Sequence, residues 1–214
     1  MPKIIATMWV TLDGFVAGLD DGMDWVRLDE QMMAYEQALV EAADILMLGR
    51  VTFGDFAGHW PHLANEPEPE FGDPSSLDAM HRAYARRIDS MRKIVVSASG
   101  NVVEWRNSET LLTIGKIDID RLNREAKGDI VIYGSVSVIN ALSALDLIDE
   151  YHLLVHPIAL GNGRPLFDSL VKLELESAEP FKSGIVLAKY RQAKGPLLQP
   201  WPCHPAREVG FQRT

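Results

Sequence analysis

The chain has 214 residues, of which 47% are apolar and 24% are charged, and its formal net charge at pH 7 is −9. This length and composition indicate a globular chain that can bury a core without a disulfide or a structural metal. The excess of negative charge argues against nonspecific binding to nucleic acid or to an anionic membrane.

The chain lacks the sequence features of a secreted or membrane-spanning protein. Its single cysteine, Cys203, cannot form an internal disulfide, and its longest apolar runs fall far short of the roughly 18 residues that cross a bilayer. No signal-peptide pattern precedes the first strand-like segment, which starts at Lys3. We therefore expect a cytoplasmic protein of enzyme size.

Predicted strands and helices alternate along the chain. Residues 3–10 (KIIATMWV) predict a strand, and after the turn signal Asp13-Gly14 the apolar residues at helical spacing predict a helix over 28–43. A strand over 43–48 follows, and then a helical start over 51–56 that gives way at Gly58 and Pro61. The three prolines and four acidic residues of 64–76 predict an exposed, mobile loop.

The second half continues this alternation. The predicted elements are, in chain order, a helix over 76–87 with Ser76 as N-cap, strands over 93–97 and 111–114, a helix over 120–126, a strand over 129–133, a helix over 136–145, a strand over 151–157 and an edge strand over 183–191. The pattern predicts an α/β fold in which helices cover both faces of a mainly parallel sheet, giving three layers. We assign residues 1–192 to one domain and residues 193–214, with four prolines, to a tail.

Three predicted strands end in residues that suit a phosphate or a ribose. Ligands of such sheets bind beyond the carboxyl ends of the strands, and a helix that starts there offers backbone N–H groups to an anion. The groups at these ends are Gly49, Arg50 and Thr52; Ser97 and Ser99; and Gly134, Ser135 and Ser137. Taken singly, a glycine after a strand is usually a turn and a serine before a helix is usually a helix cap, but together the three strand ends indicate a nucleotide binder.

Several segments resemble a known family. They are residues 8–17 (MWVTLDGFVA), 46–53 (LMLGRVTF) with Trp60-Pro61, 93–97 (KIVVS), 131–135 (VIYGS) and 147–167 (LIDEYHLLVHPIALGNGRPLF). This set is similar to the dihydrofolate-reductase-like superfamily, and most of all to the C-terminal reductase domain of the bifunctional riboflavin-biosynthesis deaminase-reductase and its stand-alone relatives. The resemblance covers nearly the whole chain.

The resemblance implies a Rossmann-like α/β/α fold, NADPH as hydride donor and a homodimer. It assigns the cofactor's phosphates to Gly49, Arg50 and Thr52, and its adenosine ribose with the 2′-phosphate to Ser97 and Ser99. It assigns the pyrophosphate to Gly134, Ser135, Val136 and Ser137, and the nicotinamide to Val16 and Ala17.

The chain also departs from these relatives. Dihydrofolate reductases carry adjacent glycines where this chain has Gly134-Ser135, and none of Asp24, Asp29 and Glu30 matches their pterin-binding acid clearly, which argues against folate as substrate. The zinc-deaminase motifs, His-x-Glu and Pro-Cys-x-x-Cys, are absent, so we expect no deamination.

The remaining candidates have two interpretations each. Asp13 either protonates or anchors the substrate, or caps backbone amides of its own turn. Trp25, Phe53 and Trp60 either stack on a flat heterocycle or pack in the core. The histidines are too scattered for a metal site, and we expect no metal.

The leading hypothesis is an NADPH-dependent reductase of a small pyrimidine-like, pterin-like or imine substrate, with residues 13–17 and 64–76 as gates of the pocket. The alternatives are a dinucleotide-binding protein without turnover and a broad-specificity reductase of quinones or other xenobiotics.

Overall fold

The structure, a computed structural model, describes residues 2–67 and 77–193. Its main strands are β1 (Ile4–Thr11), β3 (Ala43–Gly49), β4 (Arg92–Val96), β5 (Ser108–Leu111), β6 (Asp129–Tyr133), β7 (Glu150–His156), β9 (Leu173–Pro180) and β10 (Val186–Gln192). Its helices are α1 (Glu30–Ala42), α2 (Arg50–Ala64), α3 (Leu77–Ser90), α4 (Lys116–Glu125) and α5 (Val136–Ser143). A small ribbon pairs β2 (Phe15–Ala17) with β8 (Arg164–Pro165).

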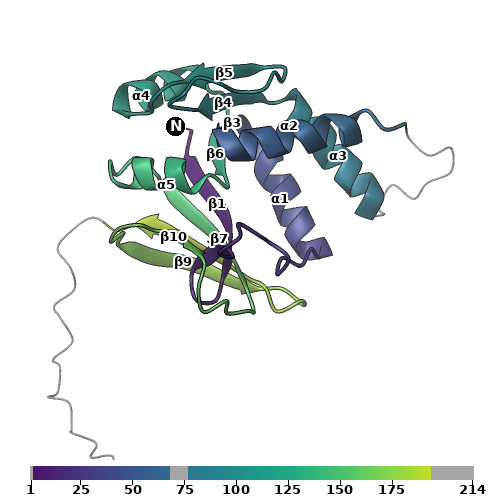
Figure 1. The fold of residues 1–214 in the computed structure, drawn as a ribbon, viewed down its shortest axis with the longest axis vertical. Coiled ribbons are helices and arrows are strands. Elements are labelled where there is room, and N and C mark those ends of the chain that lie inside the picture. Colours follow the sequence, from purple (N-terminus) through teal and green to yellow (C-terminus); the bar gives the residue numbers. More distant parts are fainter. Residues whose placement is uncertain (1, 68–76, 194–214) are drawn as a thin grey trace, which may run out of the picture.

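The main strands form one sheet in the order β5-β4-β3-β6-β1-β7-β10-β9. The strands from β5 to β7 are parallel, and only β10 runs antiparallel to its neighbours β7 and β9. Helices α1, α2 and α3 lie on one side of the strands and α4 and α5 on the other (Figure 1). The predicted mainly parallel, three-layer α/β/α fold is confirmed.

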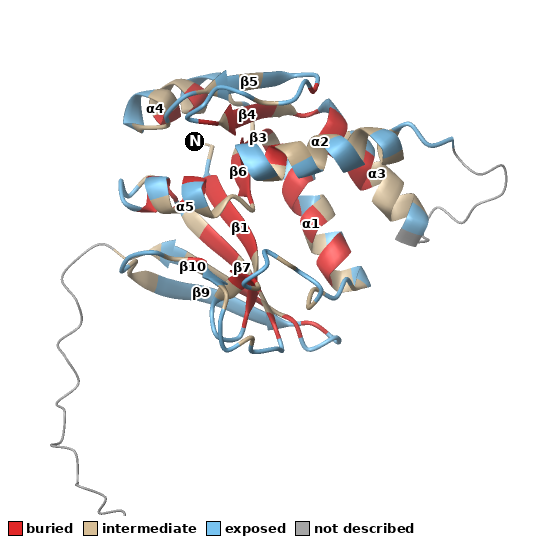
Figure 2. Ribbon diagram, viewed as in Figure 1, coloured by how far each residue is buried: buried red, intermediate tan, exposed pale blue. Residues whose placement is uncertain are grey.

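The alternation of side chains along the strands divides the core between the two faces. In β1, Ile4, Ala6 and Met8 join the apolar cluster of α4 and α5, whereas Ile5 joins that of α1, α2 and α3. Figure 2 shows the result, with the central strands buried and β9 exposed along most of its length. The carboxyl ends of β1, β3, β4 and β6 therefore lie in a row on a rigid, buried scaffold.

Two helices, α2 and α4, differ from their predicted bounds by four residues or more. α2 does not stop before Gly58 but runs through Pro61 to Ala64, and the N–H and side-chain amide of Asn65 both donate to the Pro61 carbonyl at its end. Proline has no N–H to donate, so it costs α2 one hydrogen bond. α4 begins at Lys116 rather than residue 120, because Asp118 accepts from the N–H of Gly115 (3.1 Å) and caps the first turn.

The outer strands were predicted poorly. The strand expected over 111–114 is β5, over Ser108–Leu111, and it is held by its ladder with β4 and by ion pairs of Glu109 with Arg92 (2.8 Å) and Arg121 (2.6 Å) rather than by apolar burial. The strand expected at the edge over 183–191 is β10, which lies inside the sheet. The edge is β9, whose polar sequence gave no strand signal because only its pairing with β10 defines it.

Some predictions fall outside the described residues. These are the Ser76 cap, residues 68–76 of the expected mobile loop, and residues 194–214 of the tail with Cys203. The domain boundary at residue 192 and the gating role of 64–76 stay predictions. In the part of the chain that is described, no helix combines the length and apolar character needed to cross a membrane.

Candidate functional site

Two helices begin side by side at the carboxyl ends of β3 and β6. These strands are neighbours in the sheet, and the first residues of α2 and α5 follow them directly. The N–H of Gly49 donates to Ser135 Oγ (2.7 Å), and Ser135 Oγ donates to Thr52 Oγ1 (3.1 Å). The two helix N-termini are thus joined through one serine.

Neither N-terminus is neutralised by the protein itself. α2 and α5 have no side-chain cap on their first amides and no acidic residue in the first turn. The first N–H groups of a helix lack partners within the helix and carry partial positive charge, so they favour an anion. Two such ends in contact form a site suited to a diphosphate.

Two residues at this site have an unusual backbone conformation. Gly134 and Ser135 both have positive φ, +60° and +61°, and such a conformation in serine is uncommon and points to a functional constraint. A Cβ on Gly49 would lie 3.4 Å from Ser135 Oγ and 3.6 Å from Ser137 Oγ. A Cβ on Gly134 would lie 3.3 Å from Thr52 Cγ2. We call Gly49, Thr52, Gly134, Ser135 and Ser137 the glycine–serine cradle.

Arg50 and Ser97 flank the cradle. Arg50 is the first residue of α2 and is exposed. Gly49 pairs with Val96 across β3 and β4, so Ser97 follows one residue further, buried, with its Oγ 3.2 Å from that of the exposed Ser99. The predicted phosphate and ribose residues therefore lie along three adjacent strand ends, which span about 10 Å at the usual strand spacing.

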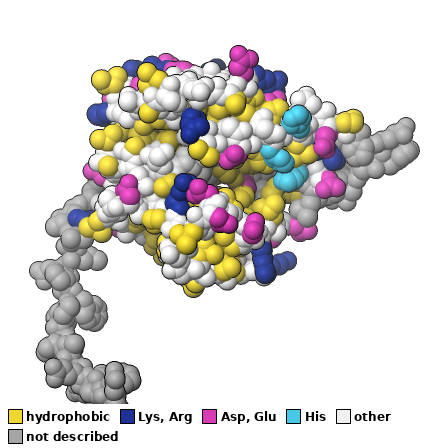
Figure 3. Space-filling view, viewed as in Figure 1, with side chains coloured by type: hydrophobic (Ala, Val, Ile, Leu, Met, Phe, Trp, Pro, Cys, Tyr) yellow, Lys and Arg dark blue, Asp and Glu magenta, His cyan; other side chains and the backbone are white. Residues whose placement is uncertain are grey.

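Figure 3 shows acidic, basic and apolar side chains interspersed over the face that it draws. An anion would thus be recognised locally, by the backbone N–H groups and Arg50, as is expected in an acidic protein.

Asp13 holds two loops together. Its carboxylate accepts from the Thr11 hydroxyl (2.6 Å), from the N–H of Gly161 (2.7 Å) and from the N–H of Leu160 (3.2 Å). The hydrogen bond from Thr11 and that from Gly161 lower the pKa of Asp13, so the side chain is ionised at neutral pH. Asp13 thus caps backbone amides, but those of the loop at residues 160–161 rather than those of its own turn, and a carboxylate of lowered pKa is a poor proton donor.

Val16 and Ala17 lie in β2, which Asp13 and β8 fix in place. Both are buried, and β2 pairs with β8 at Ala17 and Arg164. A Cβ on Gly163 would lie 2.3 Å from the Ala17 carbonyl oxygen, so only glycine allows this approach. Residues 13–17 and 160–166 consequently form one unit beyond the end of β1.

The three predicted aromatic residues have different fates. Phe53 is wrong as a stacking residue, because it is 0% exposed and packs against Trp105 in the core. Trp60 lies in an aromatic cluster with Phe56 and Tyr84 between α2 and α3, about 15 Å along α2 from the cradle. Trp25 contacts His156, the last residue of β7, and so remains at the carboxyl end of the sheet.

The sequence analysis did not identify one buried acid, Glu36. Glu36 of α1 is 3% exposed and accepts a hydrogen bond from Trp9 Nε1 (2.6 Å). Burial raises the pKa of Glu36 to about 7, against the opposing effect of hydrogen bonds from Tyr133 and Trp9. The sequence could have revealed this burial, because Glu36 falls at helical spacing on the core-facing stripe of α1 formed by Met32, Met33, Leu39 and Val40.

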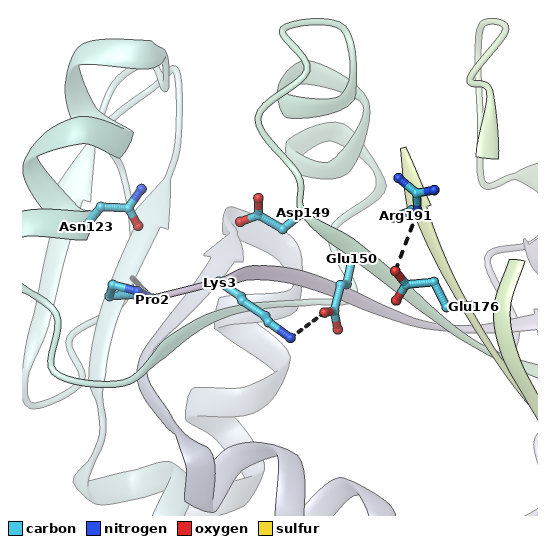
Figure 4. A pocket seen from close by; sticks show the side chains of 7 residues that line it. All are labelled: Pro2, Lys3, Asn123, Asp149, Glu150, Glu176 and Arg191. Carbon is cyan, nitrogen blue, oxygen red and sulfur yellow. Dashed lines mark hydrogen bonds and ion pairs between the residues drawn. The ribbon is translucent and has the colours of Figure 1, made fainter. Parts of the chain in front are cut away.

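A shallow pocket of about 340 Å³ lies elsewhere, at the amino ends of β1 and β7. Lys3 and Glu150 (2.6 Å), and Arg191 and Glu176, form ion pairs at its wall (Figure 4). The charged side chains of this pocket are therefore largely paired with one another. The pocket lies at the opposite ends of the strands from the glycine–serine cradle. Among the described residues, no group of three or more His, Cys, Asp or Glu side chains could hold a metal ion.

Known proteins are similar to this chain in sequence and in fold. The model of the RibD C-terminal domain matches residues 2–187. The uncharacterized protein YyaP of Bacillus subtilis (strain 168) is 28% identical over 192 residues, which are 88% of this chain and 94% of YyaP.

Solved structures agree with the family match. A putative riboflavin biosynthesis protein from Shewanella sp. PV-4 has a TM-score of 0.61 at 21% identity, over 90% of this chain and 99% of that one. The Thermotoga maritima diaminohydroxyphosphoribosylaminopyrimidine deaminase/5-amino-6-(5-phosphoribosylamino)uracil reductase has a TM-score of 0.60 at 16% identity, over 90% of this chain and 57% of its own. These structures share the fold, and with the match over residues 2–187 the chain belongs to the RibD C-terminal domain family.

Proposed function

We propose that the protein is an NADPH-dependent reductase that transfers hydride to a small heterocycle of pyrimidine or pterin type, or to an imine. The family contains RibD-type reductases, and the solved structures of similar fold include proteins named as pyrimidine or riboflavin-biosynthesis reductases. This supports an oxidoreductase; the cofactor and the substrate class are our proposal.

The observation that carries the proposal is the meeting of two uncapped helix N-termini at the glycine–serine cradle. In the proposal, Gly49, Arg50 and Thr52 hold phosphates of NADPH, while Gly134, Ser135, Val136 and Ser137 hold its pyrophosphate. Ser97 and Ser99 meet the adenosine ribose and its 2′-phosphate, and Val16 and Ala17 flank the nicotinamide.

The bound cofactor would supply the hydride, and the chain's own residues would orient and enclose the reactants. Asp13 acts in this proposal as a positioning residue, because its hydrogen bonds to Leu160 and Gly161 hold the segment that carries Val16 and Ala17. Trp25 remains the substrate-binding aromatic residue, with Trp60 as a weaker candidate because of its distance from the cradle. No strong protein acid is required, since water can protonate the reduced product.

The test is a titration with NADPH and with NADH, followed by tryptophan fluorescence. Arg50→Ala removes a charge-assisted phosphate contact, so its affinity for NADPH should fall about 10- to 150-fold, which corresponds to about 1.5–3 kcal/mol. Arg124→Ala, an exposed arginine on α4, is the matched control and should bind as the wild type does.

The outcomes separate the candidate functions. Absence of binding by either cofactor at millimolar concentration would refute the proposal. Binding without turnover of any pyrimidine, pterin or imine would favour a dinucleotide-binding protein, and weak turnover of many quinones would favour a broad-specificity reductase.

We also propose a cytoplasmic homodimer. The exposed edge strand β9 carries Glu174, Glu176 and Glu179, the first two of which pair with Arg191 of β10, and charged side chains along an edge disfavour its pairing with its own copy. Sedimentation analysis should therefore find a dimer that persists when β9 is altered, for example in Leu175→Lys.

A further inference from the structure

Glu36 is a buried carboxyl group that lies against the last residue of β6. It faces the sheet from α1, which packs against β3 and β6, and it is 3% exposed. Its carboxylate accepts from Nε1 of Trp9 in β1 (2.6 Å) and from the phenol of Tyr133, where β6 ends. Both of these donors are neutral, so neither of them supplies an opposite charge when Glu36 ionises.

Tyr133 connects Glu36 to the glycine–serine cradle. The two residues that follow Tyr133 belong to the cradle and have positive φ. The carbonyl of Tyr133 accepts from Ser135 Oγ (3.2 Å), the same oxygen that accepts from the N–H of Gly49 (2.7 Å). The ring of Tyr133 contacts Phe56 of α2, with centroids 5.4 Å apart. The residue that donates to Glu36 is therefore linked to both helices whose N-termini form the cradle.

The other titratable groups that face Glu36 are neutral near pH 7. Burial raises the pKa of three tyrosines, so their phenols stay protonated; they are Tyr133 of β6, Tyr84 of α3 and Tyr35 of α1. Beyond the Tyr35 ring lie His152 and Glu150 of β7 and Lys189 of β10. Burial lowers the pKa of His152, so it too is neutral. Glu36, whose pKa burial raises to about 7, is thus the member of this cluster that changes charge near neutral pH.

A charge on Glu36 and an anion at the cradle repel each other. The side chain of Tyr133 and the backbone as far as Ser135 separate them by about 10 Å at ordinary covalent dimensions. At this distance and an effective dielectric constant of about 20, one buried charge weakens the binding of another about 3- to 15-fold, depending on screening by salt. Linkage is reciprocal, so an anion that binds at the cradle makes Glu36 hold its proton more tightly.

We propose that Glu36 is a positioning residue of the cradle, which takes up a proton from solvent when an anionic ligand binds there and acts on the ligand through Tyr133. The inference rests on the proposed function, in which the ligand is NADPH, and deepens it by making cofactor binding depend on pH. Glu36 does not touch the ligand, because it is enclosed by the protein. The cofactor binds most tightly when Glu36 is protonated and is released more readily as the pH rises.

The test is the affinity for NADPH, measured by tryptophan fluorescence on the full chain between pH 5.5 and pH 8.5. As the pH rises, the affinity of the wild type should fall about 3- to 15-fold more than that of Glu36→Gln, which cannot ionise. The phosphates of NADPH titrate in the same way in both experiments, so the ratio of the two affinities isolates Glu36. Glu41→Gln, at an exposed position of α1, is the matched control and should follow the wild type.

Tyr133→Phe separates this coupling from a purely structural role. The variant keeps the ring that contacts Phe56 but loses the hydroxyl that donates to Glu36, so the ionised form of Glu36 loses one hydrogen bond. The fall in NADPH affinity should therefore move to higher pH by about one unit. A loss of packing alone would instead lower the affinity equally at every pH. Urea denaturation establishes that each variant is folded across the range.

Proton uptake gives an independent readout. Calorimetry at pH 7.5, in buffers that differ in their enthalpy of ionisation, counts the protons bound with each NADPH. The wild type should take up about 0.3–0.6 of a proton more than Glu36→Gln does. Equal proton uptake in the two proteins, or an affinity that varies with pH in the same way in both, would overturn the inference.

Failure here is distinguishable from failure of the proposed function, because inorganic pyrophosphate tests the cradle without a cofactor. If NADPH binds with the same pH profile in the wild type and in Glu36→Gln, the inference fails alone. If neither NADPH nor NADH binds, but pyrophosphate binds with a pH dependence that Glu36→Gln reduces, the reductase proposal fails and the inference stands. If none of the three binds, both fail.

Discussion

Glu36 should make the protein less stable as the pH rises through neutrality. Its pKa is raised from 4.5 to about 7 in the folded chain, mainly by burial. The folded state therefore binds this proton more tightly than the unfolded state, so the stability that the proton brings is complete below pH 4.5 and is lost by pH values above 7. At about 1.4 kcal/mol for each pKa unit, the loss is about 3 kcal/mol.

Glu36→Gln isolates this contribution. Glutamine has nearly the same shape, can still accept from Trp9 Nε1 and cannot ionise, so the variant should resemble the wild type at pH 5 and exceed its free energy of unfolding by about 2–3 kcal/mol at pH 8. Glu41→Gln, an exposed position on the same helix, is the control and should show no such trend.

The assay is urea denaturation of all three proteins between pH 5 and pH 8. The difference between Glu36→Gln and the wild type matters, because the other carboxylates titrate in both. A difference that does not change with pH, or a variant that is less stable than the wild type at pH 8, would contradict the buried-acid reasoning.

Two further positions give sharp predictions. Gly163→Ala should separate β2 from β8, because its Cβ would lie 2.3 Å from the Ala17 carbonyl oxygen. Limited proteolysis should then cut the variant near residues 160–166. The control, Gly54→Ala in open space on α2, should instead raise the free energy of unfolding by about 0.5–1 kcal/mol. Lys93 Nζ is buried and donates to the carbonyls of Asp89 (2.9 Å), Met91 (2.9 Å) and Arg106 (3.3 Å). Lys93→Met should therefore lower the free energy of unfolding, measured in urea, by about 3 kcal/mol. A variant as stable as the wild type would mean that these hydrogen bonds make no net contribution.

The sequence by itself determined the layers of the fold and most of the inner elements. Buried parallel strands are continuous apolar runs such as Asp129–Tyr133, and glycine or serine marks the point where each one ends. These signals lie within short stretches of sequence, so they can be recognised without knowing which strands pair. They also marked the residues at the strand ends, because a glycine followed by a helix start is visible in the chain.

Only the tertiary structure decided which of these ends meet. The order of the strands places β6 beside β3, and this brings Ser135 to the N–H of Gly49 across 86 positions of sequence. The same applies to β9, whose exposed residues become a strand only by pairing with β10. Pairing between distant segments depends on the energy of the whole sheet, and no short stretch of sequence carries that information.

The burial and contacts of individual side chains likewise depended on the tertiary structure. Phe53 and Trp25 are both aromatic residues near predicted site segments, yet one is enclosed by the core and the other ends against His156. Glu36 lies on an apolar stripe of helix α1, but its burial required Trp9 of β1 and Tyr133 of β6 to pack over it. Local pattern thus determined the residue types available at the carboxyl edge of the sheet. Packing between segments far apart in the chain decided which of them became unpaired, charged or buried.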